Sequence, residues 1–479
     1  MAISKDELLL RIRQHSKLNT HEQLRLVLLL SVPAILSQLS TILMFYIDDA
    51  MVGSLGAKAT ASIGLVATSL WLFWSVVSCI STGFSVQVAH LIGADDIDAA
   101  RSVFRQSIAT SLTLSVVVAV MGVVCAFPLP QWLGGDESIN GDATLYFLIF
   151  CAGAPLAMLQ FISGSMLRSA GNIKVPSIAN LVMCFLDVDF NFFLIFPSRT
   201  VSLLGMHVWL PGAGMGVAGA AVGTITAEAV VSVYMMWYAV ARCPELRLIG
   251  TSGSFRPQRS VLHRAYSISW PILLQRVAMN AAQIVTTIIV APLGAVAIAA
   301  NALGITAESL CYMPGYGIGE AATTLVGQCV GARRWRLTSR FAWITTLLGI
   351  ATMTFMGAVM YFAAPLMMAS LTPDMAVRAL GTECLRIEAW AEPMFAASIV
   401  AMSVFVGAGD TLKPALMNLL SMWAVRITLA AMLAPSLGLH GVWIAMAIEL
   451  SFRGLIFLAR MQWGHWMKQT LHNDISTLL

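Results

Sequence analysis

Apolar stretches of about 20 residues, long enough to cross a lipid bilayer, recur along the whole chain. Of the 479 residues, 58% are hydrophobic and 11% are charged, whereas a soluble protein has roughly 25% charged residues. This composition is incompatible with a single soluble domain. The stretches predict twelve transmembrane helices, at 24–52, 58–90, 99–127, 141–168, 175–196, 216–241, 266–290, 297–330, 338–363, 378–408, 414–434 and 440–463.

The basic residues of the connecting segments indicate how the chain is oriented. If the N-terminus is cytoplasmic, the inner segments hold 21 of the 28 Lys and Arg residues, and the outer segments hold only Lys58, Arg199 and Arg378. Because cytoplasmic loops carry the excess of basic residues, we expect both termini in the cytoplasm. The net charge of +4 is modest and the basic residues do not cluster, so we expect no nucleic-acid partner.

Proline and glycine recur at a constant spacing in the two halves of the chain. A shift of 238 positions (271 minus 33) places Pro33 on Pro271 and Gly171 on Gly409. These residues are used where the backbone needs them, so the shift predicts a recurring backbone. Because it spans six helices, both halves start on the same side of the membrane. The predicted fold is an all-α membrane protein of two six-helix bundles, related by a parallel pseudo-two-fold repeat.

The predicted division of the chain has five parts. These are a cytoplasmic N-terminal segment at 1–23, an N-lobe at 24–241, a cytoplasmic linker at 242–265, a C-lobe at 266–463 and a cytoplasmic tail at 464–479. Two lobes of this kind can rock against each other around a central cavity, which is the physical basis of alternating access.

Four motifs, taken together and in order, resemble the MATE (multidrug and toxic compound extrusion) family. They are Ile47–Gly53 followed by Leu55–Ala57, Met313–Gly319 running into Thr324–Gln328, Gly407–Thr411 with Lys413–Pro414, and Gly216–Ala221. The resemblance covers about 30–465 of the chain. It implies two bundles arranged in a V, and export of small organic, often cationic and amphipathic compounds in exchange for inward H⁺ or Na⁺. It also implies a monomer in a bacterial inner membrane, with no cofactor beyond the coupling cation.

Carboxylates inside the first helix are candidates for binding the coupling ion. A charged side chain at the bilayer centre costs about 2.5–3.5 kcal/mol on insertion scales, so one that is present is a functional candidate. Asp48 and Asp49 are adjacent and therefore point about 100° apart on a helix. By resemblance to the family pattern, Asp48 takes the place of its first-helix acid.

A second set of polar side chains lies on the fifth and sixth helices. Asp187 and Asn191 are four residues apart and share one helix face, whereas Asp189 points to nearly the opposite face. The family commonly has Asn and then Asp at these two places, so the reversed order leaves open which residue takes the ion. Thr224 matches a polar family position and adds a hydroxyl. We expect Asp48 and Asp187 to face each other, with Asn191 and Thr224 completing an oxygen cluster that takes up H⁺ or Na⁺.

The C-lobe departs from the sodium-coupled branch of the family. The places of that branch's acids in helices seven and ten are Met279 and Phe395. Glu308 and Glu392 are therefore predicted to modulate transport without being the sole coupling acids.

Two spacings in the C-lobe also allow structural ion pairs. These are Glu383 with Arg386 and Glu449 with Arg453.

Other functions have less support from the residues. A flippase of a lipid-linked precursor shares the twin-bundle plan, but it should line its cavity with several basic residues, and only Arg276 and Arg426 are suitable. The chain has no nucleophile elbow, no H-E-x-x-H motif and no Gly-rich phosphate loop followed by Lys, so we expect no enzyme. The eight Cys form no C-x-x-C pair and the eight His show no ligand spacing, so we expect no metal site.

Overall fold

The structure is a computed structural model that describes residues 4–203, 206–463 and 466–467. The N-lobe helices are α2 (Thr20–Gly53), α3 (Ala57–Gly93), α4 (Ile97–Ala126), α5 (Leu129–Trp132), α6 (Glu137–Ala152), α7 (Ala154–Ser169), α8 (Lys174–Ile195) and α9 (Val217–Ala241). The C-lobe helices are α10 (Arg259–Val290), η1 (Ala291–Leu293), α11 (Ala295–Gly331), α12 (Trp335–Leu371), α13 (Met375–Glu388), α14 (Glu392–Ala408), α15 (Leu412–Leu420), η2 (Ser421–Ile427), α16 (Thr428–Leu437) and α17 (Leu439–Trp463).

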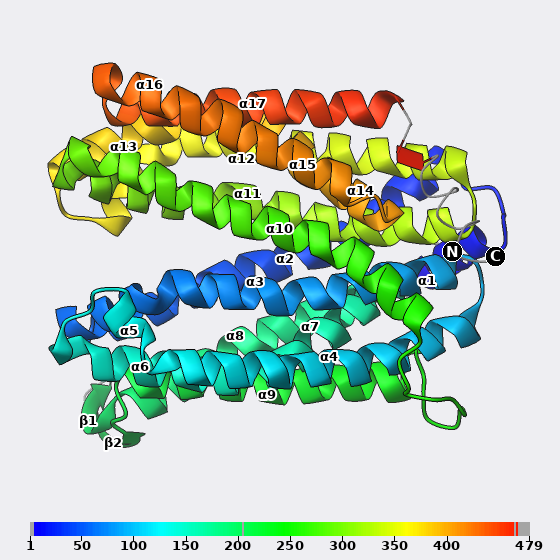
Figure 1. The fold of residues 1–479 in the computed structure, drawn as a ribbon, viewed down its shortest axis with the longest axis horizontal. Helices are drawn as coiled ribbons and strands as arrows, with labels where there is room; N and C mark the ends of the chain where they lie inside the picture. The colour runs from blue at the N-terminus through cyan, green and yellow to red at the C-terminus, as the bar shows by residue number, and fades with distance from the viewer. Residues whose placement is uncertain (1–3, 204–205, 464–465, 468–479) are drawn as a thin grey trace.

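The long helices run side by side along the longest axis of the molecule, and the two lobes lie one above the other (Figure 1). Within the described residues, ten helices are long and apolar enough to cross a membrane. Two further helix pairs, α6 with α7 and α13 with α14, pass the same test as bent spans. These together account for the twelve predicted spans.

The backbone repeats at the predicted spacing of 238 residues. Gly171 and Gly409 have φ angles of 83° and 82°. The non-glycine residues Asp95 and Arg333, also 238 apart (333 minus 95), have φ angles of 63° and 53°. Left-handed conformations are uncommon in non-glycine residues, so their recurrence at equivalent places shows that both lobes are built on the same backbone plan.

One span in each lobe is broken rather than continuous. The span predicted at 141–168 bends by 47° between α6 and α7, and the span at 378–408 bends by 61° between α13 and α14. Pro155 and Pro393 lie at the start of the second helix of each pair. Proline is favoured in the first turn of a helix and cannot continue one from before it, which explains why the helices restart there.

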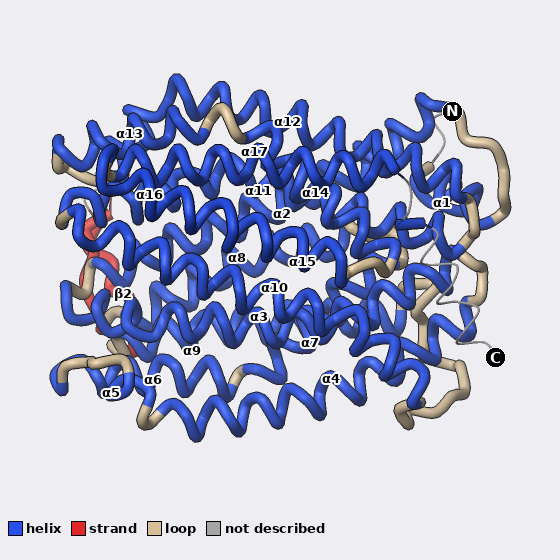
Figure 2. Tube along the Cα trace, turned by 45° about the horizontal axis from the view of Figure 1, so that its top comes forward, coloured by secondary structure: helices blue, strands red, loops and turns tan. Residues whose placement is uncertain are grey.

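The two ends of the bundle differ in their connections (Figure 2). At one end, the antiparallel strands β1 (Pro197–Leu203) and β2 (Met206–Ala213) form a hairpin between α8 and α9, in the segment that separates the spans predicted at 175–196 and 216–241. At the other end lies α1 (Lys5–Arg13), a short helix within the segment expected at 1–23. We call this the α1 end.

Two predicted boundaries shift because polar contacts extend the helices. The span expected from residue 24 begins at Thr20, where Glu22 Oε2 accepts a hydrogen bond from the Asn19 amide at 2.8 Å. Helix α10 begins at Arg259, inside the linker expected at 242–265, because the Gln258 amide donates to Gln106 Oε1 of α4 at 2.8 Å. Most of the tail expected at 464–479 lies outside the described residues.

The lobes meet closely at the α1 end through two equivalent glycines. A Cβ atom added to Gly93 of α3 would clash with the backbone of Gln328 in α11, and one added to Gly331 of α11 would clash with the backbone of His90 in α3. Residues 90 and 328 are themselves 238 apart, so the contact is reciprocal. Glycine is required here because the two backbones touch.

This contact predicts a stability difference between two glycines of α3. Gly93→Ala should lower the melting temperature of the purified protein by several degrees, because over-packing a close contact costs about 1–3 kcal/mol. Gly64→Ala is the matched control, because a Cβ at Gly64 meets nothing within 4 Å. Equal melting temperatures for the two variants would contradict the close inter-lobe contact.

Candidate functional site

Three side chains from two N-lobe helices meet near the end of the bundle that carries the hairpin. Asn191 Nδ2 of α8 donates to Asp48 Oδ1 of α2 at 2.9 Å and to Asp187 Oδ2 of α8 at 3.1 Å. Asp187 and Asn191 are completely buried, and Asp48 is half-buried. One amide group thus bridges two carboxyl groups within a membrane-spanning bundle.

The cluster keeps oxygen atoms that no protein group satisfies. Asp187 interacts directly with the Asp48 carboxyl and with the Thr224 hydroxyl of α9. The Thr224 proton, however, is donated to the Ala220 carbonyl at 3.1 Å. Asp187 Oδ1 and Asn191 Oδ1 consequently receive no hydrogen bond from the described residues. Buried polar atoms are nearly always paired, so the Asp187 carboxyl is suited to a proton, and both oxygens are suited to a small cation.

A close helix crossing positions Asn191. A Cβ atom on Gly223 of α9 would clash with Asn191 Oδ1, and one on Gly219 would lie 2.6 Å from the Leu194 carbonyl oxygen. Glycines one turn apart allow α9 to approach α8 to backbone contact. The amide that bridges the two carboxyl groups is therefore held from behind by the α9 backbone.

The structure separates the other two aspartates from this cluster. Asp49 was predicted as a coupling-ion residue, but its side chain is exposed. It reaches Asp48 only through electrostatic interaction. Asp189 is also exposed, on the face of α8 away from Asp187, as the helical period predicts.

Two residues near the cluster were not among the predicted coupling-ion residues, although Glu228 is one of the carboxylates within the predicted spans. Tyr146 of α6 is half-buried and interacts electrostatically with the carboxyl groups of Asp48 and Asp187. Glu228 lies one turn beyond Thr224 on α9, interacts with Asp187, and has an unpartnered Oε2 atom. The spacing of four from Thr224 was a usable signal for Glu228, whereas nothing in the pattern of α6 distinguishes Tyr146.

The C-lobe contains a second buried group of charged side chains. Its four glutamates and two arginines come from five helical segments, and each is at most 8% exposed. They are Glu308 of α11, Glu388 of α13, Glu392 of α14, Arg426 of η2, and Glu449 and Arg453 of α17. Two arginines cannot neutralise four ionised carboxylates, so this group, which we call the C-lobe cluster, holds an excess of acidic side chains.

The two most isolated acids flank the helix break of the C-lobe. Glu388 is the last residue of α13 and Glu392 the first of α14, where the helix axis turns by 61°. All four of their carboxyl oxygens are buried without a hydrogen-bond partner among the described residues. At the equivalent break of the N-lobe, a shift of 238 places Phe150 and Ala154. The two breaks share a backbone and differ in their chemistry.

The remaining members of the C-lobe cluster have partners. Arg453 binds Glu449 at 2.9 Å, as the spacing of four predicted. Ser421 donates to the other Glu449 oxygen at 2.6 Å. Arg426 lies in the π-helical turn η2 and contacts Met446 Sδ at 2.7 Å. Such turns occur frequently at functional sites.

The expected pairing of Glu383 with Arg386 is wrong. Glu383 lies 2.5 Å from His440 Nε2 of α17. Arg386 donates to the Tyr361 carbonyl at 3.3 Å, and its guanidinium lies over the Tyr361 ring. A neighbouring helix therefore outcompetes the local spacing for each side chain.

An aromatic ring occupies one of the places where the sequence departs from the sodium-coupled pattern. Phe395 lies between the Tyr312 ring, at 5.5 Å, and the Arg453 guanidinium, at 5.7 Å. The nearest acid in sequence, Glu392, is one turn earlier and points into the C-lobe cluster, as its interaction with Glu308 shows.

Buried acidic clusters inside two repeated helical bundles are typical of membrane transporters. A family model, described as MatE, matches residues 33–193 and 271–432. The two matches begin 238 residues apart, at the two prolines that first indicated the repeat. The chain belongs to the MatE family, whose members are transporters and not enzymes.

Curated relatives agree with this assignment. The chain is 25% identical over 447 residues to the "Probable multidrug resistance protein NorM" of Thermotoga maritima, covering 92% of this chain and 93% of that protein. It is 23% identical over 439 residues to the protein of the same name from Neisseria meningitidis serogroup B, covering 91% and 93%. The chain is thus a membrane protein with several spans and belongs to a family of multidrug transporters.

Solved structures share the fold. The structure described as "Crystal structure of MATE in complex with MaL6" aligns with a TM-score of 0.86 at 19% identity, covering 98% of this chain and 100% of that one. A transporter from Pyrococcus furiosus, described as having a binding pocket of reversed polarity, aligns with a TM-score of 0.84 at 18% identity, covering 98% and 99%.

The importance of the close crossing between α8 and α9 at Asn191 can be tested by adding one methyl group to Gly223. Gly223→Ala should displace the Asn191 amide and abolish any drug resistance that expression of the unsubstituted protein gives a sensitised bacterial host, while the protein still reaches the membrane. Gly141→Ala in α6 is the control, because a Cβ there meets nothing within 4 Å. Full resistance with Gly223→Ala would show that the position of Asn191 is unimportant.

Proposed function

We propose that this protein exports small organic, amphipathic cations in exchange for inward H⁺ or Na⁺, by alternating access between its two lobes. The observation that carries the proposal is the buried N-lobe cluster of Asp48, Asp187 and Asn191, with two oxygens that lack a donor. Burying charged groups within the membrane costs several kcal/mol, so they are retained where they have a function. Binding and release of a coupling cation is a function that explains why this cluster is present.

The proposed orientation follows from the positions of the basic residues. Of the 21 Lys and Arg residues expected on the inner side, the 20 that the structure describes lie in or beside the segments at the α1 end, and cytoplasmic loops are the basic ones. The α1 end is then cytoplasmic and the hairpin is external, in a bacterial inner membrane. Both lobes come from one chain, so the proposed active unit is a monomer.

The N-lobe cluster is accessible from the outside in this orientation. Asp48 lies in the last two turns of α2, near the hairpin end, and is half-buried, whereas Asp187 behind it is fully buried. A proton or Na⁺ entering from the outside would meet Asp48 first and then satisfy Asp187 Oδ1 and Asn191 Oδ1. No cofactor is needed beyond this coupling cation.

Exchange then requires only that cation and drug favour different conformations. A ligand shifts a conformational equilibrium by its difference in affinity between the two states. Filling the cluster neutralises the repulsion between two carboxylates and changes how α2, α8 and α9 pack. If the conformation with a filled cluster has low affinity for the drug, cation entry expels the drug, and drug binding expels the cation.

The C-lobe cluster is proposed to modulate this cycle. Glu308, Glu388 and Glu392 are buried and interact with one another, and two of them flank a helix break. Movement at the break would change their separation and hence the energy of charging them. Glu308 and Glu392 are therefore assigned a supporting role, and Glu388 joins them.

Lipid-linked precursor flipping is less consistent with the polar groups. Arg276 is exposed, and Arg426 is enclosed among the glutamates of the C-lobe cluster. Neither is part of a basic cavity that could hold a pyrophosphate.

Neutralising the N-lobe carboxylates should abolish export. Asp48→Asn and Asp187→Asn should each reduce resistance to toxic organic cations to that of cells without the protein, because an amide cannot take up a proton or replace a carboxylate ligand. Asp189→Asn, on the exposed face of the same helix, is the control and should keep most of the resistance. Substrate-driven cation flux in proteoliposomes, with and without Na⁺, would identify the ion. Normal flux in both cluster variants would refute the proposal.

Neutralising the C-lobe acids should slow export without abolishing it. Glu392→Gln and Glu388→Gln preserve side-chain shape, so each should lower the transport rate in proteoliposomes several-fold while substrate-coupled ion movement persists. Complete loss of coupling in Glu392→Gln, together with normal coupling when every N-lobe carboxylate is neutralised, would move the coupling site to the C-lobe.

A further inference from the structure

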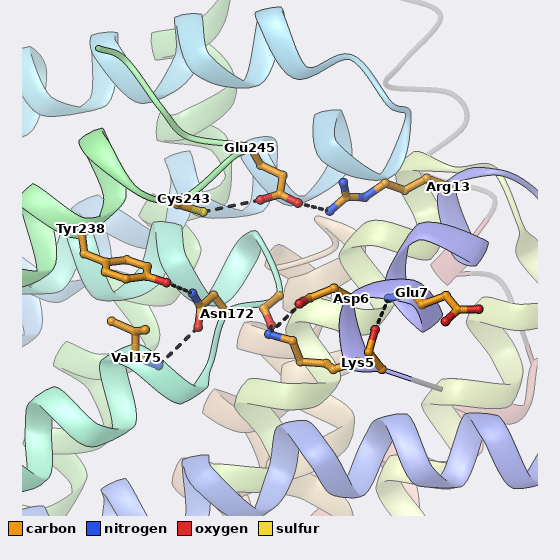
Figure 3. A network of polar contacts seen from close by, with 11 residues as sticks. Lys5, Asp6, Glu7, Arg13, Asn172, Val175, Tyr238, Cys243 and Glu245 are labelled. Carbon is orange, nitrogen blue, oxygen red and sulfur yellow. Dashed lines mark hydrogen bonds and ion pairs between the residues drawn. The ribbon is translucent and has the colours of Figure 1, made fainter. Parts of the chain in front are cut away.

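Helix α1 lies at the α1 end and contacts both lobes, and Figure 3 shows the polar residues around it on the N-lobe side. It is a nine-residue helix whose Ser4 Oγ accepts from the Glu7 amide at 3.2 Å, which caps its N-terminus. Residues 14–19 join it to α2. Nothing in the proposed exchange cycle uses this helix.

The apolar face of α1 is enclosed by both lobes. Leu8, Leu9 and Ile12 are at most 3% exposed. They belong to one apolar cluster with Ile173, between α7 and α8 of the N-lobe, and with Leu325 of α11 in the C-lobe. Burial of this extent stabilises an attached helix, at about 1.5–3 kcal/mol for each fully buried Leu or Ile.

Polar contacts fasten α1 to the N-lobe. Lys5 Nζ donates to the Gly171 carbonyl at 3.1 Å, and Arg13 binds Glu245 at 3.0 Å (Figure 3). Asn172 holds the receiving loop against α9 through the Tyr238 hydroxyl at 3.4 Å.

The Glu245 carboxylate is itself held in place by its neighbour. Burial is the main reason that the pKa of the Cys243 thiol is raised to about 12, so the thiol stays protonated and donates to Glu245 Oε2 at 3.5 Å. The carboxylate that binds Arg13 is therefore already held in position by the Cys243 thiol.

One arginine fastens α1 to the C-lobe. Arg334, between α11 and α12, donates to the carbonyl oxygens of Arg11 at 2.9 Å, Ile12 at 3.4 Å and Ser16 at 2.8 Å. The Arg11 and Ile12 carbonyls belong to the last turn of α1, where helical carbonyls attract cations, and the Ser16 carbonyl lies in the connection to α2. A single side chain therefore caps the helix and ties it to the second lobe.

The contacts around α1 close the same end of the molecule. Gln328 of α11 donates to the Ser169 carbonyl at 2.8 Å, and Thr324 donates to the Arg168 carbonyl at 3.1 Å. Separation of the lobes at this end would break these bonds and would also detach α1 from one lobe. Because α1 is joined covalently to α2 of the N-lobe, the contacts with Arg334 are those that must break.

We propose that α1 acts as a latch: its contacts with both lobes stabilise the conformation that is closed at the α1 end. The contacts of Arg334 with α1 are those that break when this end opens. The inference rests on the proposed function in one respect, namely that the lobes separate at this end during the cycle. Release of the latch is then part of the energy needed to open the path to the cytoplasm.

The latch is testable by measuring the distance between the lobes directly. Asp98 and Arg336 are equivalent exposed residues at the starts of α4 and α12 (336 minus 98 is 238). Both are replaced by Cys and spin-labelled in the full chain with Cys125→Ser, since Cys125 is the exposed native cysteine of the described residues. Double electron–electron resonance in lipid nanodiscs, without drug or ion gradient, measures the distribution of distances between the two labels. This distribution gives the ratio of molecules open at the α1 end to molecules closed there.

The expected result is a larger open population when the latch is cut. Loss of three charge-assisted hydrogen bonds in Arg334→Ala should raise the open-to-closed ratio about ten-fold. Arg13→Glu removes an ion pair on the N-lobe side of α1 that persists when the lobes separate, so it should leave the ratio unchanged. Combining Arg13→Glu with Glu245→Arg restores the pair and should also give the ratio of the labelled parent.

The control is the adjacent arginine. Arg333→Ala removes the same charge from the same loop, but Arg333 is exposed and makes none of the α1 contacts that the structure describes. If Arg334→Ala gives the same ratio as Arg333→Ala, α1 is not a latch. Because no transport is measured, a changed ratio supports the latch even if export assays refute the proposed function, and an unchanged ratio refutes the latch even if export is normal.

Discussion

The cost of an unpaired charge in a lipid bilayer governs the arrangement of this protein. Backbone groups avoid that cost by forming helices throughout the spans. Most of the buried charged side chains that the structure describes are gathered into two groups, one per lobe, and Arg105 of α4 is separate from both. Arg453 and Glu449 satisfy each other, but Asp187, Glu388 and Glu392 keep oxygens without a partner. Packing alone does not explain these acids.

Glycine determines how closely the helices that carry these acids approach. Gly223 brings α9 against Asn191 and so fixes the amide between two carboxyl groups, whereas Gly93 and Gly331 bring the two lobes into backbone contact. Glycine therefore shapes the candidate ion site in one place and the contact between the two lobes in another. At both places a methyl group would force helices apart, so site geometry and lobe contact depend on the absence of side chains as much as on their presence.

Sequence analysis predicted the features that depend on local composition. The spans and the repeat follow from apolar runs and from Pro and Gly, and they are confirmed. The helix face that carries Asp187 and Asn191 follows from the helical period. Asp48 joins them in the structure, although the role of this cluster stays a prediction.

Features that depend on neighbouring helices were not predictable in the same way. Tyr146 reaches the N-lobe cluster from a helix without any distinguishing pattern, and Asp49 points away from it although it is adjacent to Asp48. His440 takes the partner that a spacing of three assigned to Arg386. The isolation of Glu388 is visible only once the break beside it is known. Each case depends on which helix packs against the residue. The sequence of one segment does not specify that neighbour.

The reciprocal contact between the lobes has the form of an interface in a symmetric dimer. Gly93 meets Gln328 and Gly331 meets His90, so each partner offers the same patch to the other, which defines an isologous contact. Two separate six-helix chains that each carried this patch would pair through it in the same way. Joining two copies through residues 242–258 then replaces an encounter between molecules with an encounter within one chain, at a high effective concentration. Fusion also releases the two copies from identity, so that one could acquire Glu388 and Glu392 where the other keeps Phe150 and Ala154.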